Sequence, residues 1–211
     1  MISCSGTRWI IGSGTYLDIA FQAWKLALPH ERIRREEITQ NADFEFNLEV
    51  FSQVDREHDF VFLAFNEKFG NFKRSELMQA ALERGLQLDS FISPKAMLSA
   101  EVSIGKNSFL GDGVVVGANT KIDYNTVVLA GASVGFKAHV KACCWIESGV
   151  HVGDGASIGS HSILRTGTIV APGVKVGRFC EIAVPGRYGD DIPARTVYDP
   201  RYDAPIFVYG S

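Results

Sequence analysis

The chain has 211 residues, of which 46% are hydrophobic and 21% charged, and its formal net charge is -3. This composition predicts one large domain or two small ones with a substantial core, and it disfavours disorder. A slightly acidic chain lacks the basic surface that grips nucleic-acid phosphates. No apolar run approaches the roughly 18 residues of a membrane helix, so no membrane span is expected.

The N-terminal residues lack the long apolar stretch of a signal peptide. The four cysteines are Cys4, Cys143, Cys144 and Cys180, and none of them form a C-x-x-C pair. Four cysteines in a chain of this length do not make a disulfide framework. We therefore expect a cytoplasmic protein with free thiols.

The first third of the chain alternates short apolar runs with segments of helical periodicity. Residues 31–59 are polar and show no clear pattern. Strands are predicted at 8–11, 60–65 and 86–92, and helices at 16–28 and 73–84. This order predicts a small Rossmann-like α/β domain over residues 1–91.

A glycine turn, Gly12-Ser13-Gly14-Thr15, separates the first strand from the first helix. Such a turn at a helix N-terminus can hold a phosphate with its free N–H groups. However, Leu17 stands where the G-x-G-x-x-G pattern needs a third glycine, and Asp18 would repel a phosphate. The sequence is therefore compatible with two interpretations of this turn, a phosphate site and an ordinary connection between strand and helix.

A six-residue repeat fills most of the remaining sequence. Every sixth residue from Ile92 to Ile182 is Ile, Leu or Val, and the fourth residue after each is small or β-branched. Glycine often follows the aliphatic residue directly, where we expect the backbone to bend. Six residues do not return to one face of an α-helix, whereas a chain that turns a corner after each short strand fits the pattern. The repeat predicts a parallel β-helix of three faces and about five coils.

These residues resemble the left-handed β-helix of hexapeptide-repeat acyltransferases. With the α/β segment ahead of it, the chain is similar to bacterial nucleotide-sugar N-acyltransferases, such as the UDP-4-amino-sugar acetyltransferase of bacillosamine synthesis, and to NeuD-type sialic acid O-acetyltransferases. The resemblance rests on residues 60–65, Lys73-Arg74, 86–94 and 191–197 in the family's order. It divides the chain into a nucleotide-sugar domain (1–91), an acyl-CoA β-helix domain (92–190) and a C-terminal tail (191–211).

The resemblance implies transfer of an acetyl group from CoA to an amino group on a nucleotide-linked sugar. It implies a homotrimer, no metal, and a place in surface polysaccharide or glycoprotein synthesis. Substrate contacts would fall on Ser13, Gly14, Thr15 and Asn66. Acyl-CoA contacts would fall near Trp145, Asp154, Thr166, Gly167, Ala183 and Val184. The CoA phosphates could meet Lys175, Arg178 and Arg187.

The chain departs from the family at the proton acceptor, because the family's histidine falls on Phe136. His139 is the nearest replacement, since histidine exchanges protons near neutral pH, or else it is a corner residue. His161 should stack on Cys143 one coil away as an alternative nucleophile pair, and His151 is most simply an exposed edge residue.

The spacing of His139, His151 and His161 does not repeat at 18 residues, which argues against a zinc site and a carbonic anhydrase. Trp145 and Phe179 are expected to protrude as trimer contacts. The alternatives to N-acylation are sugar O-acetylation and an inactive scaffold in which Phe136 marks a lost base.

Overall fold

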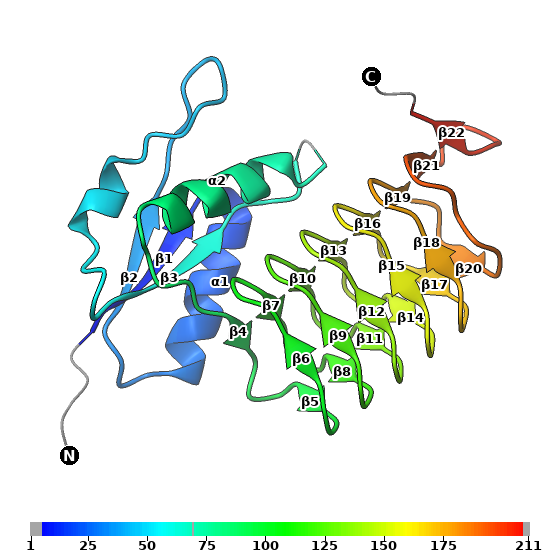
Figure 1. Ribbon diagram of the computed structural model, residues 1–211, viewed down its shortest axis with the longest axis horizontal. Coiled ribbons are helices and arrows are strands. Elements are labelled where there is room, and N and C mark those ends of the chain that lie inside the picture. Colours follow the sequence, from blue (N-terminus) through cyan, green and yellow to red (C-terminus); the bar gives the residue numbers. More distant parts are fainter. Residues whose placement is uncertain (1–5, 69, 209–211) are drawn as a thin grey trace.

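The computed structural model describes residues 6–68 and 70–208, and Cys4 lies outside this part. A three-stranded parallel sheet with two α-helices comes first, followed by a long parallel β-solenoid (Figure 1). No helix of the described residues is long and apolar enough to cross a membrane.

The sheet has the order β2-β1-β3, built from β1 (Arg8–Gly12), β2 (Ile33–Glu37) and β3 (Phe60–Ala64). Alternate residues of these strands face opposite sides, so Ile10 and Phe62 pack with α1 (Gly14–Ala27), whereas Ile11 and Leu63 pack with α2 (Phe72–Glu83). A short 3-10 helix, η1 (Glu49–Gln53), precedes β3. Two strand expectations need correction. Charged β2 lies in the polar stretch where none was predicted, and residues 86–90 contribute only a bridge from Leu88 to Val61.

The solenoid has three faces of stacked strands, consistent with a left-handed β-helix. The first face comprises β4 (Phe91–Ile92), β7 (Phe109–Leu110), β10 (Val127–Val128), β13 (Trp145–Ile146), β16 (Ile163–Leu164), β19 (Glu181–Ile182) and β21 (Thr196–Tyr198), with β22 (Ile206–Phe207) antiparallel at its edge. The second comprises β5 (Met97–Leu98), β8 (Val115–Val116), β11 (Ser133–Val134), β14 (His151–Val152), β17 (Thr168–Val170) and β20 (Gly186–Tyr188). The third comprises β6 (Ser103–Ile104), β9 (Lys121–Ile122), β12 (His139–Val140), β15 (Ser157–Ile158) and β18 (Lys175–Val176). The described second face has six strands, so the solenoid runs to about six turns rather than five.

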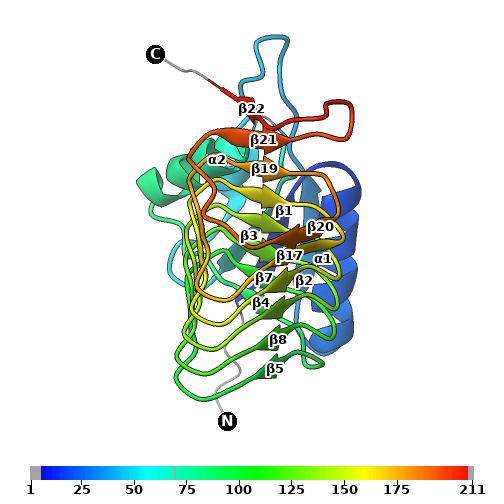
Figure 2. The ribbon, with the colours of Figure 1, turned by 90° about the vertical axis from the view of Figure 1, so that its right-hand side faces the viewer.

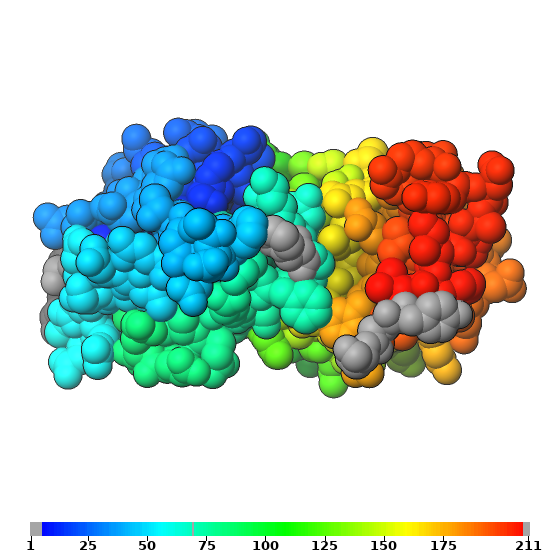
Figure 3. All heavy atoms as spheres, turned by 90° about the horizontal axis from the view of Figure 1, so that it is seen from above, coloured from blue at the N-terminus to red at the C-terminus, as the bar shows by residue number. Residues whose placement is uncertain are grey.

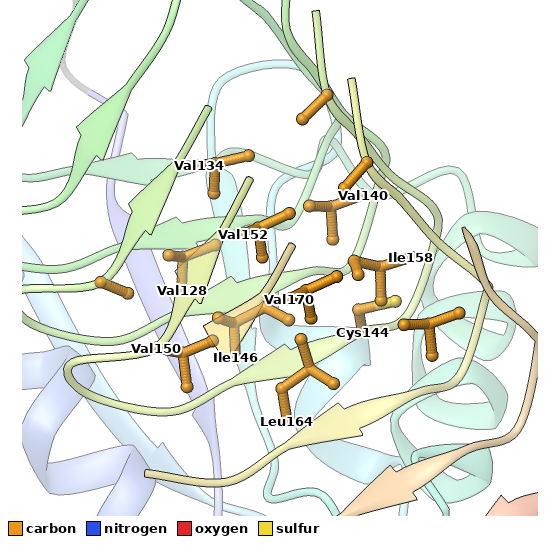
Figure 4. Close-up of a cluster of buried hydrophobic side chains, with 14 of the residues drawn as sticks. Val128, Val134, Val140, Cys144, Ile146, Val150, Val152, Ile158, Leu164 and Val170 are labelled. Carbon is orange, nitrogen blue, oxygen red and sulfur yellow. The ribbon is translucent and has the colours of Figure 1, made fainter. Parts of the chain in front are cut away.

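The repeat aliphatics form the core of the solenoid, as predicted. Ile146, Val152 and Ile158 come from three different faces and point toward a common axis (Figure 4). The first coil is the exception, because Ile92 is 42% and Leu98 36% exposed. Each buried aliphatic lies between the coils before and after it, and these two have a neighbouring coil on one side only.

The glycines that follow the aliphatic residues are required because adjacent coils approach closely there, and not because the backbone bends at them as expected. A Cβ built on Gly135 would lie 2.4 Å from the Asp154 Oδ1 atom and 2.6 Å from the Asp154 nitrogen, so adjacent coils approach too closely for a side chain. The corners turn instead at a left-handed residue two positions further on, such as Lys137 (φ 54°) or Asn107 (φ 56°).

The first face of the solenoid packs against the α/β unit. Trp145 is only 6% exposed and lies edge-on to the ring of Tyr16 in α1, with ring centroids 5.0 Å apart. Phe179 stacks on Phe72 of α2 at 5.4 Å. The expectation that Trp145 protrudes is therefore wrong, and Phe179 has an aromatic partner within its own chain.

Candidate functional site

The outward residues of the three faces differ in chemistry. Those of the first face are mainly apolar and covered, and those of the third are polar: Ser103, Lys121, His139, Ser157 and Lys175. The second face presents Met97, Val115, Ser133, His151, Ile169 and Arg187. Met97 is 61% exposed, and Val115 and Ile169 are also exposed. Figure 2 looks along the solenoid from its C-terminal end, so that the second-face strand β20 is nearer the viewer than β5 and β8. The second face is thus partly apolar and uncovered in the single chain.

A groove of about 520 Å³ runs along the second face and its corner with the third. Phe136 and Asp154 line it from the corner, and Ser133, His151 and Arg187 line it from the strands. Phe136 donates its backbone N–H to the Asp154 Oδ1 atom at 2.8 Å. Phe136, at the position where the family's histidine was expected, therefore lines a groove that also contains polar side chains.

His139 and His151 occupy different surfaces. The Nε2 atom of His139 lies 3.0 Å from the Asp123 Oδ2 atom on the third face, and His139 does not line the groove. His151 lines the groove, with its Nδ1 atom 2.7 Å from the Ser133 Oγ atom. The sequence alone predicted an exposed edge residue at His151 and assigned it no role. The signal was its spacing of 18 residues from Ser133, which stacks the two on adjacent coils.

Thr166 and Gly167 lie on the corner between the first and second faces, and Ala183 and Val184 lie on the same corner one coil later. Thr166 donates its N–H and its hydroxyl to the Glu147 Oε2 atom, at 2.9 and 3.2 Å. The structure therefore places these four residues and Asp154 on opposite borders of the second face. Trp145 is apart from them, buried under α1.

Ser13, Gly14 and Thr15 lie at the start of α1, beyond the carboxyl end of β1. Ser13 makes no side-chain capping bond. Arg35 donates to the Asp18 Oδ1 atom at 2.9 Å, which offsets the charge that would repel a phosphate. Asn66 follows β3 at the same edge of the sheet and accepts the N–H of Lys68.

Arg165 connects the loop after β3 to the solenoid. Its Nη1 atom lies 3.0 Å from Glu67 and 2.8 Å from Glu147, and its Nη2 atom lies 2.8 Å from Glu181. Burial raises the pKa of Glu147, but hydrogen bonds from Arg165 and the Thr166 amide outweigh it, so the pKa lies below its ordinary value. The loop that carries Asn66 therefore borders the corner that carries Thr166. Figure 3 shows this middle part of the molecule between the α/β unit and the C-terminal segment.

Cys143 and His161 occupy equivalent corner positions on adjacent coils, as expected. Cys143 is buried, and its Sγ atom accepts from the Asn125 amide at 3.5 Å. His161 lies against Phe72 and Phe179, and burial lowers its pKa. The two side chains thus have separate partners. No group of three His, Cys, Asp or Glu side chains that could hold a metal occurs in the described residues.

Comparison with known proteins agrees with this architecture. Residues 75–166 match the family model described as GlmU-like, C-terminal hexapeptide. No curated protein sequence matches the chain.

Solved structures match over most of the chain. GDP-perosamine N-acetyltransferase from Caulobacter crescentus, crystallised with CoA and GDP-perosamine, is 22% identical, with 91% of this chain and 92% of that one covered and a TM-score of 0.78. The acetyltransferase domain of PglB from Neisseria gonorrhoeae, in complex with acetyl coenzyme A, is 22% identical over 90% and 94%, with a TM-score of 0.63. WeeI from Acinetobacter baumannii is 17% identical over 90% and 95%, with a TM-score of 0.56.

The solenoid is therefore of the hexapeptide-repeat class. Over about nine tenths of its length the chain has the fold of GDP-perosamine N-acetyltransferase and of the PglB acetyltransferase domain, so the fold that the sequence resemblance implies is confirmed.

Proposed function

We propose that the chain is an acetyl-CoA-dependent N-acyltransferase that acts on the amino group of a nucleotide-linked amino sugar. The observation that carries this proposal is the connection of the two predicted sites in one chain. The Glu67–Arg165 ion pair holds the loop beside the glycine turn against the corner of Thr166. A relative of the same fold over 91% of this chain binds CoA and GDP-perosamine together.

In this proposal acetyl-CoA lies along the second face, bordered by Thr166, Gly167, Ala183 and Val184 on one side and Asp154 on the other. Arg187 supplies a positive charge for a CoA phosphate on the same face. The Rossmann-like α/β unit binds the nucleotide sugar. Its pyrophosphate accepts N–H groups of Ser13, Gly14 and Thr15 at the start of α1, beside Asn66.

The protein works as a homotrimer in the cytoplasm, where acetyl-CoA is available, and its product enters surface polysaccharide or glycoprotein synthesis. The exposed apolar residues of the second face support the trimer. Met97 and Val115 are neighbours on this face, Ile169 lies beyond the polar Ser133 and His151, and the chain's own elements leave all three apolar side chains exposed. A second copy that packs there would remove these apolar side chains from water and close the groove over the bound CoA.

Acyl transfer to an amine needs a proton acceptor, because the attacking nitrogen must lose a proton. Phe136 cannot take this role, which leaves His139 on the third face and His151 in the groove as the candidates. No metal is proposed.

The experiment is to incubate the protein with acetyl-CoA and a panel of nucleotide-linked amino sugars, including GDP-perosamine. The release of free CoA thiol is measured for each pair. Release that depends on both substrates supports the proposal, and amide formation on the sugar nitrogen distinguishes it from O-acetylation of a sugar such as sialic acid. Tight binding of a nucleotide sugar with no thiol release from any pair would refute it.

That second outcome would favour a binding or scaffold protein. The observation behind this alternative is Phe136, an exposed aromatic residue at the position where the family carries its histidine.

A further inference from the structure

The groove on the second face contains few groups that can exchange a proton. Among its described lining residues the titratable side chains are His151, Asp154 and Arg187. Arg187 is permanently charged and cannot accept a proton. The Oδ1 atom of Asp154 already accepts the backbone N–H of Phe136 at 2.8 Å.

We propose that His151 is the proton acceptor of the acyl transfer and that Ser133 positions it. This inference rests on the proposed function, since it names a catalytic residue for that reaction. His151 is the first residue of β14, and its outward position stacks directly on Ser133 of β11 and below Ile169 of β17. The side chain is exposed in the groove, where a substrate can reach it.

The hydrogen bond to Ser133 holds the imidazole ring by its Nδ1 atom, and it fits the tautomer that the proton acceptor needs. When the His151 Nδ1–H donates to the Ser133 Oγ atom, at 2.7 Å, the lone pair of the ring resides on Nε2. The described residues offer Nε2 no other hydrogen bond, so it is available to the substrate. In His139, by contrast, the Nε2 atom is already engaged by Asp123.

The step balances in protons and electrons. The amine nitrogen attacks the thioester carbonyl carbon, and the new C–N bond forms as the C–S bond breaks. The nitrogen's proton passes to His151 Nε2, and the imidazolium then returns it to the departing sulfur, so the products are the amide and CoA thiol. The charged groups that line the groove are Asp154 and Arg187, while the strands on either side contribute neutral Ser133 and Ile169.

The first test is histidine NMR of the whole protein with ring-labelled His, titrated with acetyl-CoA. The imidazole signals of His151, assigned with the His151→Gln variant, should shift on binding. A shift confined to His139 would overturn the assignment and return the role to that residue. Calorimetry on the same sample distinguishes failure of the His151 inference from failure of the proposed function. Bound acetyl-CoA with a silent His151 refutes this inference alone, whereas no binding refutes the proposed function with it.

The second test is turnover with the acceptor sugar that gives the fastest thiol release. His151→Gln should lower kcat by about 100-fold or more, the usual size of a general-base contribution, with the KM for acetyl-CoA little changed. The acid limb of the pH profile should disappear as well. His58→Gln is the matched control, because His58 is an exposed histidine of the α/β unit that pairs with Asp55. An active His151→Gln enzyme with the wild-type pH profile would contradict the inference.

Ser133 has its own test, because it acts through the imidazole. Ser133→Ala should lower kcat and shift the acid limb of the pH profile, and Ser133→Thr, which keeps the hydroxyl, should restore both. A Ser133→Ala enzyme with an unchanged pH profile would show that Ser133 has no positioning role.

Discussion

Asn107 fastens the edge of the α/β sheet to the solenoid, and its removal makes the sharpest stability prediction. Its Oδ1 atom accepts the N–H of Leu63 in edge strand β3 at 2.7 Å, and its Nδ2 atom donates to the Leu63 carbonyl at 3.3 Å. The same Nδ2 atom donates to Asn125 Oδ1 at 2.8 Å. The side chain thus replaces a neighbouring strand for one residue of β3.

The Asn107→Ala variant leaves the Leu63 N–H, the Leu63 carbonyl and the Asn125 Oδ1 atom without the partner that Asn107 supplies. Each such buried group costs about 1–3 kcal/mol, so the three together should lower the free energy of unfolding by about 3–9 kcal/mol. Asn119→Ala is the control. Asn119 has the same left-handed backbone (φ 58°) but is exposed, so this variant carries only the conformational penalty of about 1–2 kcal/mol.

The measurements are urea unfolding of both variants and hydrogen exchange of the Leu63 amide. We expect Asn107→Ala to be the less stable variant by the amount above, with faster exchange at Leu63. Equal unfolding free energies and unchanged exchange at Leu63 would refute the reasoning.

Four other variants test the core, a corner, a buried histidine and the second face. Leu164→Ala removes a fully buried side chain and should cost about 2–5 kcal/mol in urea unfolding, and a cost under 1 kcal/mol would contradict the stacked core. Gly135→Ala places a methyl group against Asp154 and should lower the free energy of unfolding by about 1–3 kcal/mol. An unchanged free energy would show that the two coils can separate to admit the methyl group. Burial lowers the pKa of His161, so the unfolded chain binds the proton more readily, and stability falls as the pH drops below about 6.5. His161→Phe should reduce the change in the free energy of unfolding between pH 7 and pH 5. An unchanged pH dependence would show that another group causes it. Met97→Glu places a charge beside Val115 on the exposed second face and should shift sedimentation from trimer to monomer, whereas an intact trimer would show that the interface lies on another face.

The solenoid could be predicted from the sequence because its core is periodic. An inward aliphatic such as Ile146 recurs every sixth residue over sixteen repeats, and that long hexapeptide period is typical of a parallel β-helix. Strand β2 could not be predicted in this way. It is an edge strand that pairs with β1 alone and carries charged residues such as Arg34 and Glu36, so it lacks the apolar pattern by which a buried strand is predicted.

The site was only partly accessible from the sequence. The spacing of 18 residues places Phe136 beside Asp154, and it also pairs His151 with Ser133, which single-residue reasoning did not use. Trp145 was misplaced for a different reason. A hexapeptide repeat shows which residues point outward but not which face another part of the chain will cover.

The most direct test of the central claim is a calorimetric titration of the folded protein with acetyl-CoA. Acyl transfer on the second face predicts saturable binding of one acetyl-CoA per chain, followed by heat from a nucleotide-linked amino sugar. A folded protein with no detectable acetyl-CoA binding would contradict the claim and favour a β-solenoid scaffold without acyl transfer.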